Sequence, residues 1–415
     1  MKIVQTPCRD DLTARIRSRR LLRLFLLFLL TFGLSLSVPP RADTQSSDAL
    51  RFTGSLKFQE VSPGIEHGQV ASGYVSKDEL TGPWFINLLR IDLSRATLKI
   101  VHALDEGVGL ETVSSISNRY KAMAATNGGY FRTTGTYRGE STGLLLLDGK
   151  LISEPNNDRV GVGLITTGAN TEVVFGYLKF LGEIQVNRTK HIVQGMNRPR
   201  STDELIVFTP EFHRTSLTNP DGIEVVVRRN RVLAINDQMG SSAIPNDGFV
   251  ISAVGKARQW VTANLRKGSK VTFSWSLRPL RPNANNEDEK WRRVYSSVGA
   301  GPQLIRAGKI DITDQQEKMS LNFRADRHPR TAMARLASGR LLLATVDGRQ
   351  SGVSVGMSLD MLADLLLELG AVEAINLDGG GSTTMVVHNK LLNRPSDQNG
   401  ERPVGDAILV FSKPN

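Results

Sequence analysis

The sequence contains very little cysteine or histidine. Cys8 is the only cysteine among 415 residues, and there are six histidines. One cysteine near the start cannot supply a disulfide framework, a cysteine metal site or a thiolate nucleophile to the rest of the chain. His328 has no HExxH pattern or other close carboxylate spacing around it, so it is interpreted as a structural or orienting residue.

Dense basic stretches with interleaved aromatic residues are also missing, although the formal net charge is +11. The first 42 residues hold eight Lys or Arg against two Asp, which leaves about +5 for the remainder. A weakly basic body of this kind does not indicate a nucleic-acid partner. Neither GxxxxGK[ST] nor GxGxxG occurs, which argues against a nucleotide-binding protein.

Long apolar runs are absent except for one near the start. Residues 24–38 are free of charge, several arginines precede them, and Pro39, Pro40 and Ala42 follow. This pattern predicts a signal peptide or N-terminal anchor over residues 1–42, with cleavage near Ala42 favoured because the run is short for a membrane span. Residues 43–55 are predicted to be a polar linker. We expect an extracytoplasmic protein, which contacts a membrane only through this segment if it stays uncleaved.

A helix, a strand and a glycine turn form the most informative stretch. Apolar residues recur at helical spacing over 358–369, with Ser358 placed as N-cap and Gly370 as terminator. The apolar segment 372–378 predicts a buried strand that delivers Asn376 and Asp378 to a turn. Three glycines leave room for a ligand against the backbone there. The alternative is a glycine-rich hairpin with a structural Asp.

The rest of the chain from residue 56 to 415 reads as one catalytic domain rich in strands. We expect an antiparallel pair over 84–93 and 96–104, a helix over 111–123 and a hairpin over 141–153 that turns at Asp148. A β-rich middle section covers about 155–281. The predicted fold class is α+β, with a mixed β-sheet core flanked by helices.

Two further polar segments carry candidate site residues. Asn127, Gly128 and Gly129 form a second glycine turn after an apolar stretch, a pattern that an ordinary hairpin turn also produces. Arg330 and Thr331 precede another strand. A planar guanidinium suits bidentate binding of phosphate or carboxylate, whereas the alternative is an arginine on a solvated loop.

Five blocks together resemble the phosphodiester glycosidase family: AATNGGYF, RHPRTAMA, ATVDGRQ, INLDGGGSTTMVV and NRPSDQNGERPV. They occur in the family's order, and the resemblance covers about residues 58–411. It implies an exported or luminal hydrolase that cleaves the bond between a sugar anomeric carbon and a phosphodiester, on an α+β scaffold. The chain lacks the cysteine-rich extension of animal members and looks closer to bacterial ones, which suggests an envelope or exopolysaccharide glycan as substrate.

Such a reaction needs a carboxyl group at the anomeric carbon and donors that hold an anionic leaving group. Asp378 is the predicted central carboxylate, and Asp347 and Glu140 are both candidates for a second one. The predicted substrate-binding residues lie in the three polar segments: Asn127, Gly128, Gly129, Arg330, Thr331, Asn376, Gly379, Gly380, Gly381, Ser382 and Thr383. Arg330 and the three glycine amides are assigned to the phosphate.

One alternative function remains open: a carbohydrate-binding envelope protein without catalysis, for which asparagines, glycines and exposed aromatics suffice. No cofactor is required by the sequence. Asp347 and Asp378 could share a divalent ion, but their spacing does not demand one. The partner expected in either case is a glycan or a glycosyl phosphate.

Overall fold

The computed structural model describes residues 56–72, 82–156, 158–168, 170–280 and 287–414. These residues all belong to the compact unit Ala49–Asn415. The predicted signal segment 1–42 and the linker 43–55 lie outside the described residues. Among the helices that are described, none has both the length and the apolar character needed to cross a membrane.

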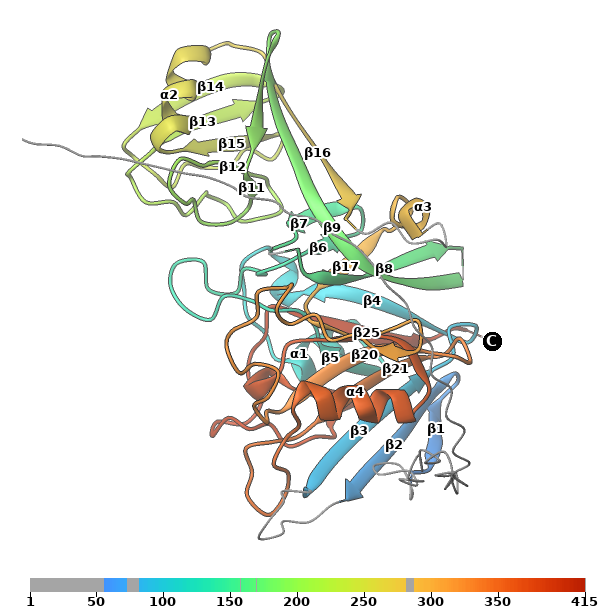
Figure 1. The fold of residues 1–415 in the computed structure, drawn as a ribbon. Coiled ribbons are helices and arrows are strands. Elements are labelled where there is room, and N and C mark those ends of the chain that lie inside the picture. Colours follow the sequence, from blue (N-terminus) through green and yellow to red (C-terminus); the bar gives the residue numbers. More distant parts are fainter. Residues whose placement is uncertain (1–55, 73–81, 157, 169, 281–286, 415) are drawn as a thin grey trace, which may run out of the picture. The chain divides into compact units, whose positions relative to one another are not determined.

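An eight-stranded antiparallel sheet carries the C-terminal motifs (Figure 1). Its strands, in spatial order, are β1 (Phe58–Ser62), β2 (Ile65–Ser72), β3 (Trp84–Ile91), β21 (Leu341–Val346), β20 (Arg330–Leu336), β22 (Ala371–Asn376), β18 (Gln303–Arg306) and β19 (Lys309–Ile310). Strands β20, β21 and β22, which come from the last quarter of the chain, are central. They are therefore largely buried, and Arg330, Thr331 and Asn376 lie where β20 begins and β22 ends.

The helix α4 (Leu359–Glu368) packs against β22 and β18, as Figure 1 shows in orange. It begins where predicted, because the Ser358 hydroxyl accepts a hydrogen bond from the Met361 amide at 3.2 Å. Gly370 follows with φ of +85°, a conformation that favours glycine. The apolar stripe of α4 and side chains of β3, β20 and β21 form one core cluster, so the predicted helix and the strand after it are confirmed.

A second, five-stranded sheet lies across a shared core from the first. Its order is β24 (Lys390–Leu391), β23 (Met385–Val387), β5 (Ala124–Asn127), β25 (Asp406–Ser412) and β4 (Ala96–His102). Residues of β3 and β4 lie in the same hydrophobic cluster. The 3-10 turn η1 (Ala103–Asp105) and the helix α1 (Val113–Tyr120) follow β4, and α1 packs on β5.

The prediction that 84–93 and 96–104 form an antiparallel pair is wrong. Strand β3 pairs with β2 and β21, whereas β4 pairs with β25. The short turn after Ile91 joins two strands that belong to different sheets. Both strands are almost wholly buried and bring Leu89 and Leu98 into one core, so they pack face to face instead of edge to edge.

The middle of the chain forms two more sheets. One contains β10 (Thr189–Val193), β9 (Asn170–Val186), β8 (Val160–Thr167), β17 (Ser296–Gly299), β6 (Leu145–Leu147) and β7 (Lys150–Ser153), with β16 (Val271–Pro279) paired to β9. The other contains β11 (Gly195–Met196), β12 (Leu205–Phe208), β15 (Gly248–Ala253), β13 (Ile223–Arg228) and β14 (Arg231–Asp237). The predicted hairpin at Asp148 is the β6–β7 pair.

Helices are fewer than the predicted α+β class implies. Strands make up 46% of the described residues and helices make up 11%. The described α-helices are α1, α2 (Gly255–Asn264), α3 (Glu287–Trp291) and α4. The β-rich core and β-rich middle section are confirmed, but a core flanked by helices is not, because sheets cover one another. The parallel pair β11–β12 is the one place where the described sheets are mixed.

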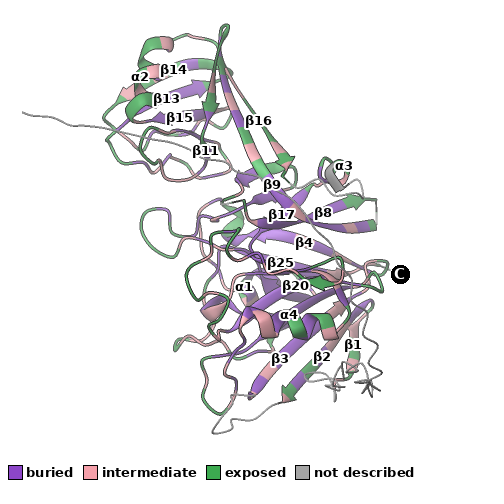
Figure 2. Ribbon diagram, in the orientation of Figure 1, coloured by how far each residue is buried: buried purple, intermediate pink, exposed green. Residues whose placement is uncertain are grey.

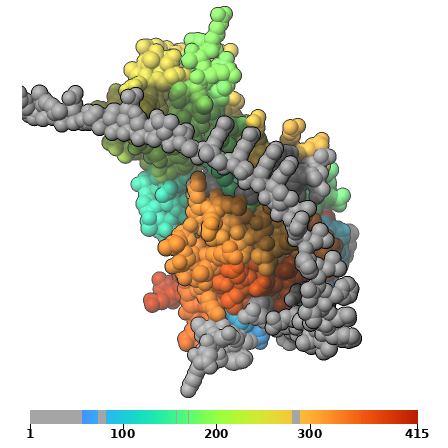
Figure 3. Space-filling view, in the orientation of Figure 1, coloured from blue at the N-terminus to red at the C-terminus, as the bar shows by residue number. Residues whose placement is uncertain are grey.

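Burial follows this layering. Strands β4, β20 and β25 are largely purple, meaning buried, in Figure 2. Green, exposed segments gather on loops and on α2 and β16. In the space-filling view of Figure 3, the orange and red part of the chain forms a contiguous surface on the face shown. The C-terminal motifs thus combine a buried scaffold with loops that reach the surface.

Candidate active site

The glycine turn after β22 is held against two other loops. The amide of Asp378 donates to the carbonyl oxygen of Gly128 at 3.0 Å. The amide of Gly380 donates to the carbonyl oxygen of Pro329 at 2.9 Å. The turns predicted separately at 127–129 and 378–383 are therefore neighbours, and both adjoin the start of β20.

Asn127 is the side chain that ties these loops together. Its Nδ2 donates to the carbonyl oxygen of Asp378 at 2.7 Å. Its Oδ1 accepts from the Thr331 hydroxyl at 2.9 Å and from the Thr384 amide at 3.1 Å. Asn127 and Thr331, both predicted to bind substrate, are thus buried and bonded to the protein itself. In this structure they position the Asp378 turn.

Two of the glycines allow charged side chains to pack against the backbone. A Cβ on Gly128 would overlap the carboxylate of Asp406. A Cβ on Gly381 would overlap both the Arg402 guanidinium and the Asp397 carboxylate. The carboxylate against Gly128 is buried, and the two side chains against Gly381 form an ion pair with each other. The glycines therefore create close contacts between charged groups and the turn.

The Asp378 carboxyl group lies in surroundings that favour its neutral form. The residue as a whole is partly exposed, but burial of the carboxyl raises its pKa to about 7. The hydrogen bond from the Gly379 amide, at 2.9 Å, and the charge of Arg402 lower the pKa, and the charge of Asp406 raises it. A carboxyl group that titrates near neutrality can exchange protons during a reaction.

Asp406 is a functional candidate that the sequence analysis missed. It begins β25 and is almost fully buried. Its Oδ1 accepts from the Gly129 amide at 2.7 Å and its Oδ2 accepts from the Ser141 hydroxyl at 3.2 Å. Burial raises its pKa to about 6. Its position just after the NRPSDQNGERPV block was the only signal available in the sequence.

Tyr130, which is partly buried, and Asn376, which is buried, form a second polar pair near Asp378. The Tyr130 hydroxyl donates to the carbonyl oxygen of Gly301 at 2.7 Å and accepts from Asn376 Nδ2 at 3.0 Å. Burial and the charge of Asp378 raise the pKa of Tyr130. The Oδ1 of Asn376 is buried without a hydrogen-bond partner among the described residues. Asn376 therefore keeps one acceptor unused near the turn.

Arg330 is buried and largely committed to the backbone. Its Nε donates to the carbonyl oxygen of Met357 at 2.9 Å. Its Nη2 donates to the carbonyl oxygens of Phe323 and Asp326 at 2.9 and 2.8 Å. Burial lowers its pKa to about 10. Only Nη1 remains for the phosphate that the sequence analysis assigned to it, so a two-pronged grip through Nη1 and Nη2 would require breaking these bonds.

The guanidinium groups of two other arginines lie against the glycine turn. Arg349 is exposed, and its Nη2 lies 3.2 Å from where a Cβ on Gly380 would be. It also contacts His328 Nδ1 at 3.3 Å. Arg402 makes a two-pronged ion pair with Asp397, with bonds of 2.7 and 2.9 Å. Arg349 is therefore the more available cation, and neither arginine was among the predicted site residues.

The predicted phosphate-binding amides are partly occupied. The Gly379 amide donates to the Asp378 carboxylate, and the Gly380 amide donates to Pro329. Ser382 and Thr383 are buried, and the Thr383 hydroxyl has no hydrogen-bond partner within the described chain. Two of the amides that were expected to be free are therefore occupied, whereas the Thr383 hydroxyl lacks a partner in the described structure.

Asp347 is not brought against Asp378 by any described contact. Its Oδ1 accepts from Asn393 Nδ2 at 3.1 Å and its Oδ2 accepts from the Arg394 amide at 2.8 Å. Burial raises its pKa to about 6. Both oxygens therefore fasten the loop after β24. Within the described part of the chain, no three His, Cys, Asp or Glu side chains are grouped as a metal site would require.

Glu140 lies in a different cleft from the glycine turn. It pairs with Arg132 at 2.9 Å and lines a cavity with Glu154 and Arg198. The charges that act on it come from these residues and not from Asp378. The carboxylate that influences Asp378 is Asp406 instead. The structure therefore separates the three predicted catalytic carboxylates into three local environments.

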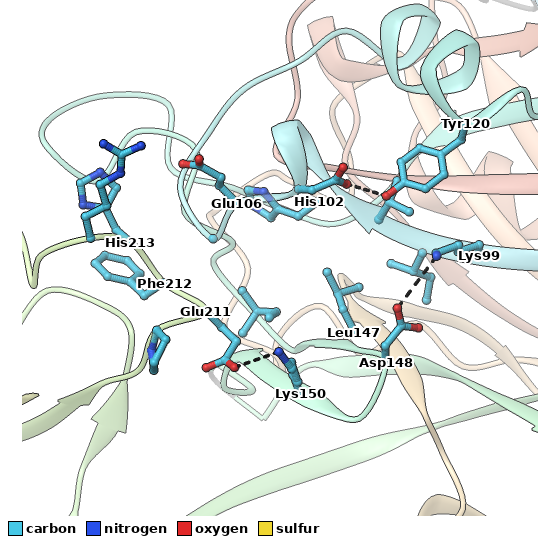
Figure 4. A pocket seen from close by; sticks show the side chains of 17 residues that line it. Lys99, His102, Glu106, Tyr120, Leu147, Asp148, Lys150, Glu211, Phe212 and His213 are labelled. Carbon is cyan, nitrogen blue, oxygen red and sulfur yellow. Dashed lines mark hydrogen bonds and ion pairs between the residues drawn. The ribbon is translucent and has the colours of Figure 1, made fainter. Parts of the chain in front are cut away.

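Two more clefts flank this region. One of about 730 Å³ contains Asp397 and Arg402, which lie against the glycine turn, together with Phe131 and Arg138. Another of about 520 Å³ is shown in Figure 4. There Lys99 pairs with Asp148 at 3.9 Å, and the second dashed ion pair joins Lys150 to Glu211. The second cleft contains none of the predicted site residues.

Comparison with known proteins gives the following relatives. The sequence model of the family described as phosphodiester glycosidase matches residues 221–411. An N-acetylglucosamine-1-phosphodiester alpha-N-acetylglucosaminidase of Mus musculus is 41% identical over 156 residues, which is 37% of this chain and 30% of that protein. The SPbeta prophage-derived uncharacterized protein YomE of Bacillus subtilis is 39% identical over 115 residues, which is 28% of this chain and 17% of that one. The chain therefore spans less than a third of the length of these relatives.

One solved structure agrees with the fold over most of the chain. It is a protein of Burkholderia pseudomallei whose name describes it as a candidate exported protein. The two share 22% sequence identity with a TM-score of 0.72, covering 87% of this chain and 97% of that one. At this identity the likeness concerns the fold alone. The family model and the sequence relatives confirm the resemblance to the phosphodiester glycosidase family that the five blocks predicted.

Proposed function

We propose that this protein hydrolyses the bond between the anomeric carbon of a sugar and a phosphodiester, at the turn that carries Asp378. The observation that carries the proposal is the Asp378 carboxyl group. Its pKa is raised to about 7, and it sits on a turn whose glycines admit Arg402 and Arg349. A proton-exchanging group beside cations suits the release of an anionic leaving group.

The proposed reaction is a displacement at the anomeric carbon. The ionised Asp378 removes a proton from a water molecule, whose oxygen forms a bond to that carbon. The bond from carbon to phosphate oxygen breaks, and its electron pair leaves with the phosphate monoester. Because this leaving group is stable as an anion, one carboxylate suffices and no strong acid is needed to protonate it.

The phosphate is assigned to the cations at the turn. Arg349 is exposed and has only His328 as a side-chain partner in the described structure. Arg402 reaches the turn through its ion pair with Asp397, and Arg330 retains Nη1. The guanidinium of Arg349 can offer two parallel donors to phosphoryl oxygens. This assignment moves the main phosphate contact from Arg330 to Arg349.

The names of two similar proteins support the proposed reaction class and the proposed location. The name of the mouse relative describes hydrolysis of an N-acetylglucosamine phosphodiester, and we take from it the bond type but not the sugar. The fold neighbour described as exported agrees with an extracytoplasmic site of action. An envelope or exopolysaccharide glycan with sugar-1-phosphodiester linkages is the proposed substrate class.

The decisive experiment incubates the full chain with a panel of glycosyl-1-phosphodiesters in water enriched in heavy oxygen. We expect the label in the released sugar, because the water oxygen attacks carbon. Label in the phosphate would mean cleavage of the bond to phosphorus and would overturn the proposed displacement. Binding of the sugars without release of any product would favour the alternative, a carbohydrate-binding protein that does not catalyse.

A further inference from the structure

A separate cleft of about 470 Å³ lies around Glu140. It is formed by the loop after β5, the end of β7 and the segment that leads from β10 to β12. No residue of the 378–383 turn lines it. Its volume lies within the range of sites for small ligands.

Glu140 is the polar group that points to a ligand there. The residue is 3% exposed, and its Oε2 accepts from Arg132 Nε at 2.9 Å. Glu140 lines the cleft, and its Oε1 has no hydrogen-bond partner among the described residues. Burial raises the pKa of Glu140 to about 7, against the charge of Arg132. The carboxyl group can thus both accept and donate a hydrogen bond near neutral pH.

Arg198, a half-buried arginine that lines this cleft, already has two ion-pair partners. Arg198 Nε donates to Glu154 Oε1 at 2.6 Å, and its Nη1 and Nη2 donate to Glu204 at 2.7 and 3.0 Å. The second oxygen of Glu154 accepts from the Met196 amide at 2.6 Å. These groups have no strong unsatisfied charge to offer. An anionic ligand would therefore gain little from Arg198 and would meet the Glu140 carboxyl group.

The remaining lining combines apolar side chains and hydroxyl groups with two amides, Asn156 and Gln194, and two exposed residues of opposite charge, Asp158 and Lys179. Phe180, which is half-buried, lines the cleft together with Pro155 and Pro199, and so does Thr142, which is partly exposed. Apolar faces with a few convergent polar groups match a ligand that has both hydroxyl groups and C–H faces. We propose that this cleft is a second carbohydrate site, in which Glu140 binds the hydroxyl groups of an uncharged sugar unit. It does not depend on the hydrolysis proposed at Asp378.

The test measures sugar binding by the full chain in an Asp378→Asn background, so that catalysis at the glycine turn cannot affect the result. The probes are N-acetylglucosamine as the neutral sugar, and glucosamine and glucuronate as its charged counterparts, each titrated by calorimetry or saturation-transfer NMR. We expect N-acetylglucosamine to bind more tightly than either charged sugar. Glu140→Gln keeps an acceptor for Arg132 but removes the carboxylate, and should weaken this binding on the order of fivefold or more.

The matched control is Glu211→Gln, which makes the same change at an ion-paired glutamate in the cleft of Figure 4. Its sugar binding should equal that of the background protein. Thr142→Val provides a second variant with nearly unchanged volume, expected to weaken binding severalfold if Glu140→Gln does not fold. Unchanged affinity in the folded cleft variants, preference for a charged sugar, or no detectable binding of N-acetylglucosamine would each overturn the proposal.

Discussion

Replacing Asp378 by asparagine tests the proposed chemistry most directly. Asparagine keeps the shape of the side chain and an acceptor for the Gly379 amide, which now lies 2.9 Å from the carboxylate. The turn should therefore keep its conformation. The change removes the ability to take up a proton, which is the property that the surroundings of Asp378 enhance.

The expected loss of activity is large. A positioned general base contributes roughly a hundredfold to ten-thousandfold to a rate. We expect kcat for a glycosyl phosphodiester to fall by about a hundredfold or more. KM should change less, because Arg349 and the hydroxyl groups of the turn remain in place. A loss confined to KM would place Asp378 in binding rather than chemistry.

The Asp378→Asn substitution should lower activity, but it should not lower the free energy of unfolding. The pKa of Asp378 rises from 3.8 to about 7 on folding. Between these pH values the folded protein holds a proton that the unfolded chain has released, so stability falls as pH rises through this window. Three pH units at about 1.4 kcal/mol each set an upper limit of about 4 kcal/mol, which solvent at this partly exposed residue reduces. Asparagine does not titrate, so the Asp378→Asn variant does not lose stability as pH rises through this window.

The assay combines steady-state turnover with thermal unfolding of the same preparation at pH 4 and pH 8. The variant should be inactive, at least as stable as the unmodified protein at pH 8, and without that advantage at pH 4. Asp148→Asn is the control, because Asp148 is exposed at a turn in a left-handed conformation that asparagine tolerates. Near-normal turnover of folded Asp378→Asn would refute the catalytic assignment.

Four further substitutions test the surrounding structure. Arg330→Lys should lower the free energy of unfolding by about 2 kcal/mol or more in denaturant titrations, because a lysine cannot satisfy the three carbonyls that Arg330 reaches; an unchanged stability with lost phosphate affinity would restore its predicted role. Arg349→Gln should weaken inhibition by inorganic phosphate roughly tenfold while thermal unfolding stays unchanged, since the residue is exposed. Asp406→Asn should move the midpoint of the pH–activity profile below about 7, because it removes a negative charge that raises the pKa of Asp378; a shift to higher pH would contradict this coupling. Ser358→Ala should cost about 1 kcal/mol of stability by loss of the α4 cap, with activity unchanged.

Local features of the fold could be predicted from the sequence because short stretches determine them. The apolar spacing over 358–369, with Ser358 before it and Gly370 after it, specifies α4. The Asp148 turn specifies the β6–β7 hairpin in the same way. Both glycine turns were also placed correctly at strand ends. Each of these depends on contacts within about ten residues.

Strand pairing depended on distant parts of the chain. β3 and β4 are adjacent in sequence, and adjacency favours a hairpin. In the structure β3 pairs instead with β21, and β4 pairs with β25. Both partners come from the C-terminal part of the chain. The same apolar pattern fits either arrangement, because an apolar run indicates that a strand is buried on both faces but does not indicate which strand it pairs with.

The composition of the site was also decided by tertiary structure. The sequence by itself indicated Asp378 and its glycines, because a carboxylate at a strand end beside three glycines is unusual. It could not assign Arg330 to three carbonyls, Asp347 to the Arg394 loop or Glu140 to another cleft, since a residue type does not reveal its partners. Asp406 approaches the turn only because β25 pairs with β5, and Arg349 only because the loop after β21 brings it against Gly380. Proton affinity and charge at Asp378 are set by these neighbours, because burial and electrostatic interaction depend on distance in space and not on separation along the chain.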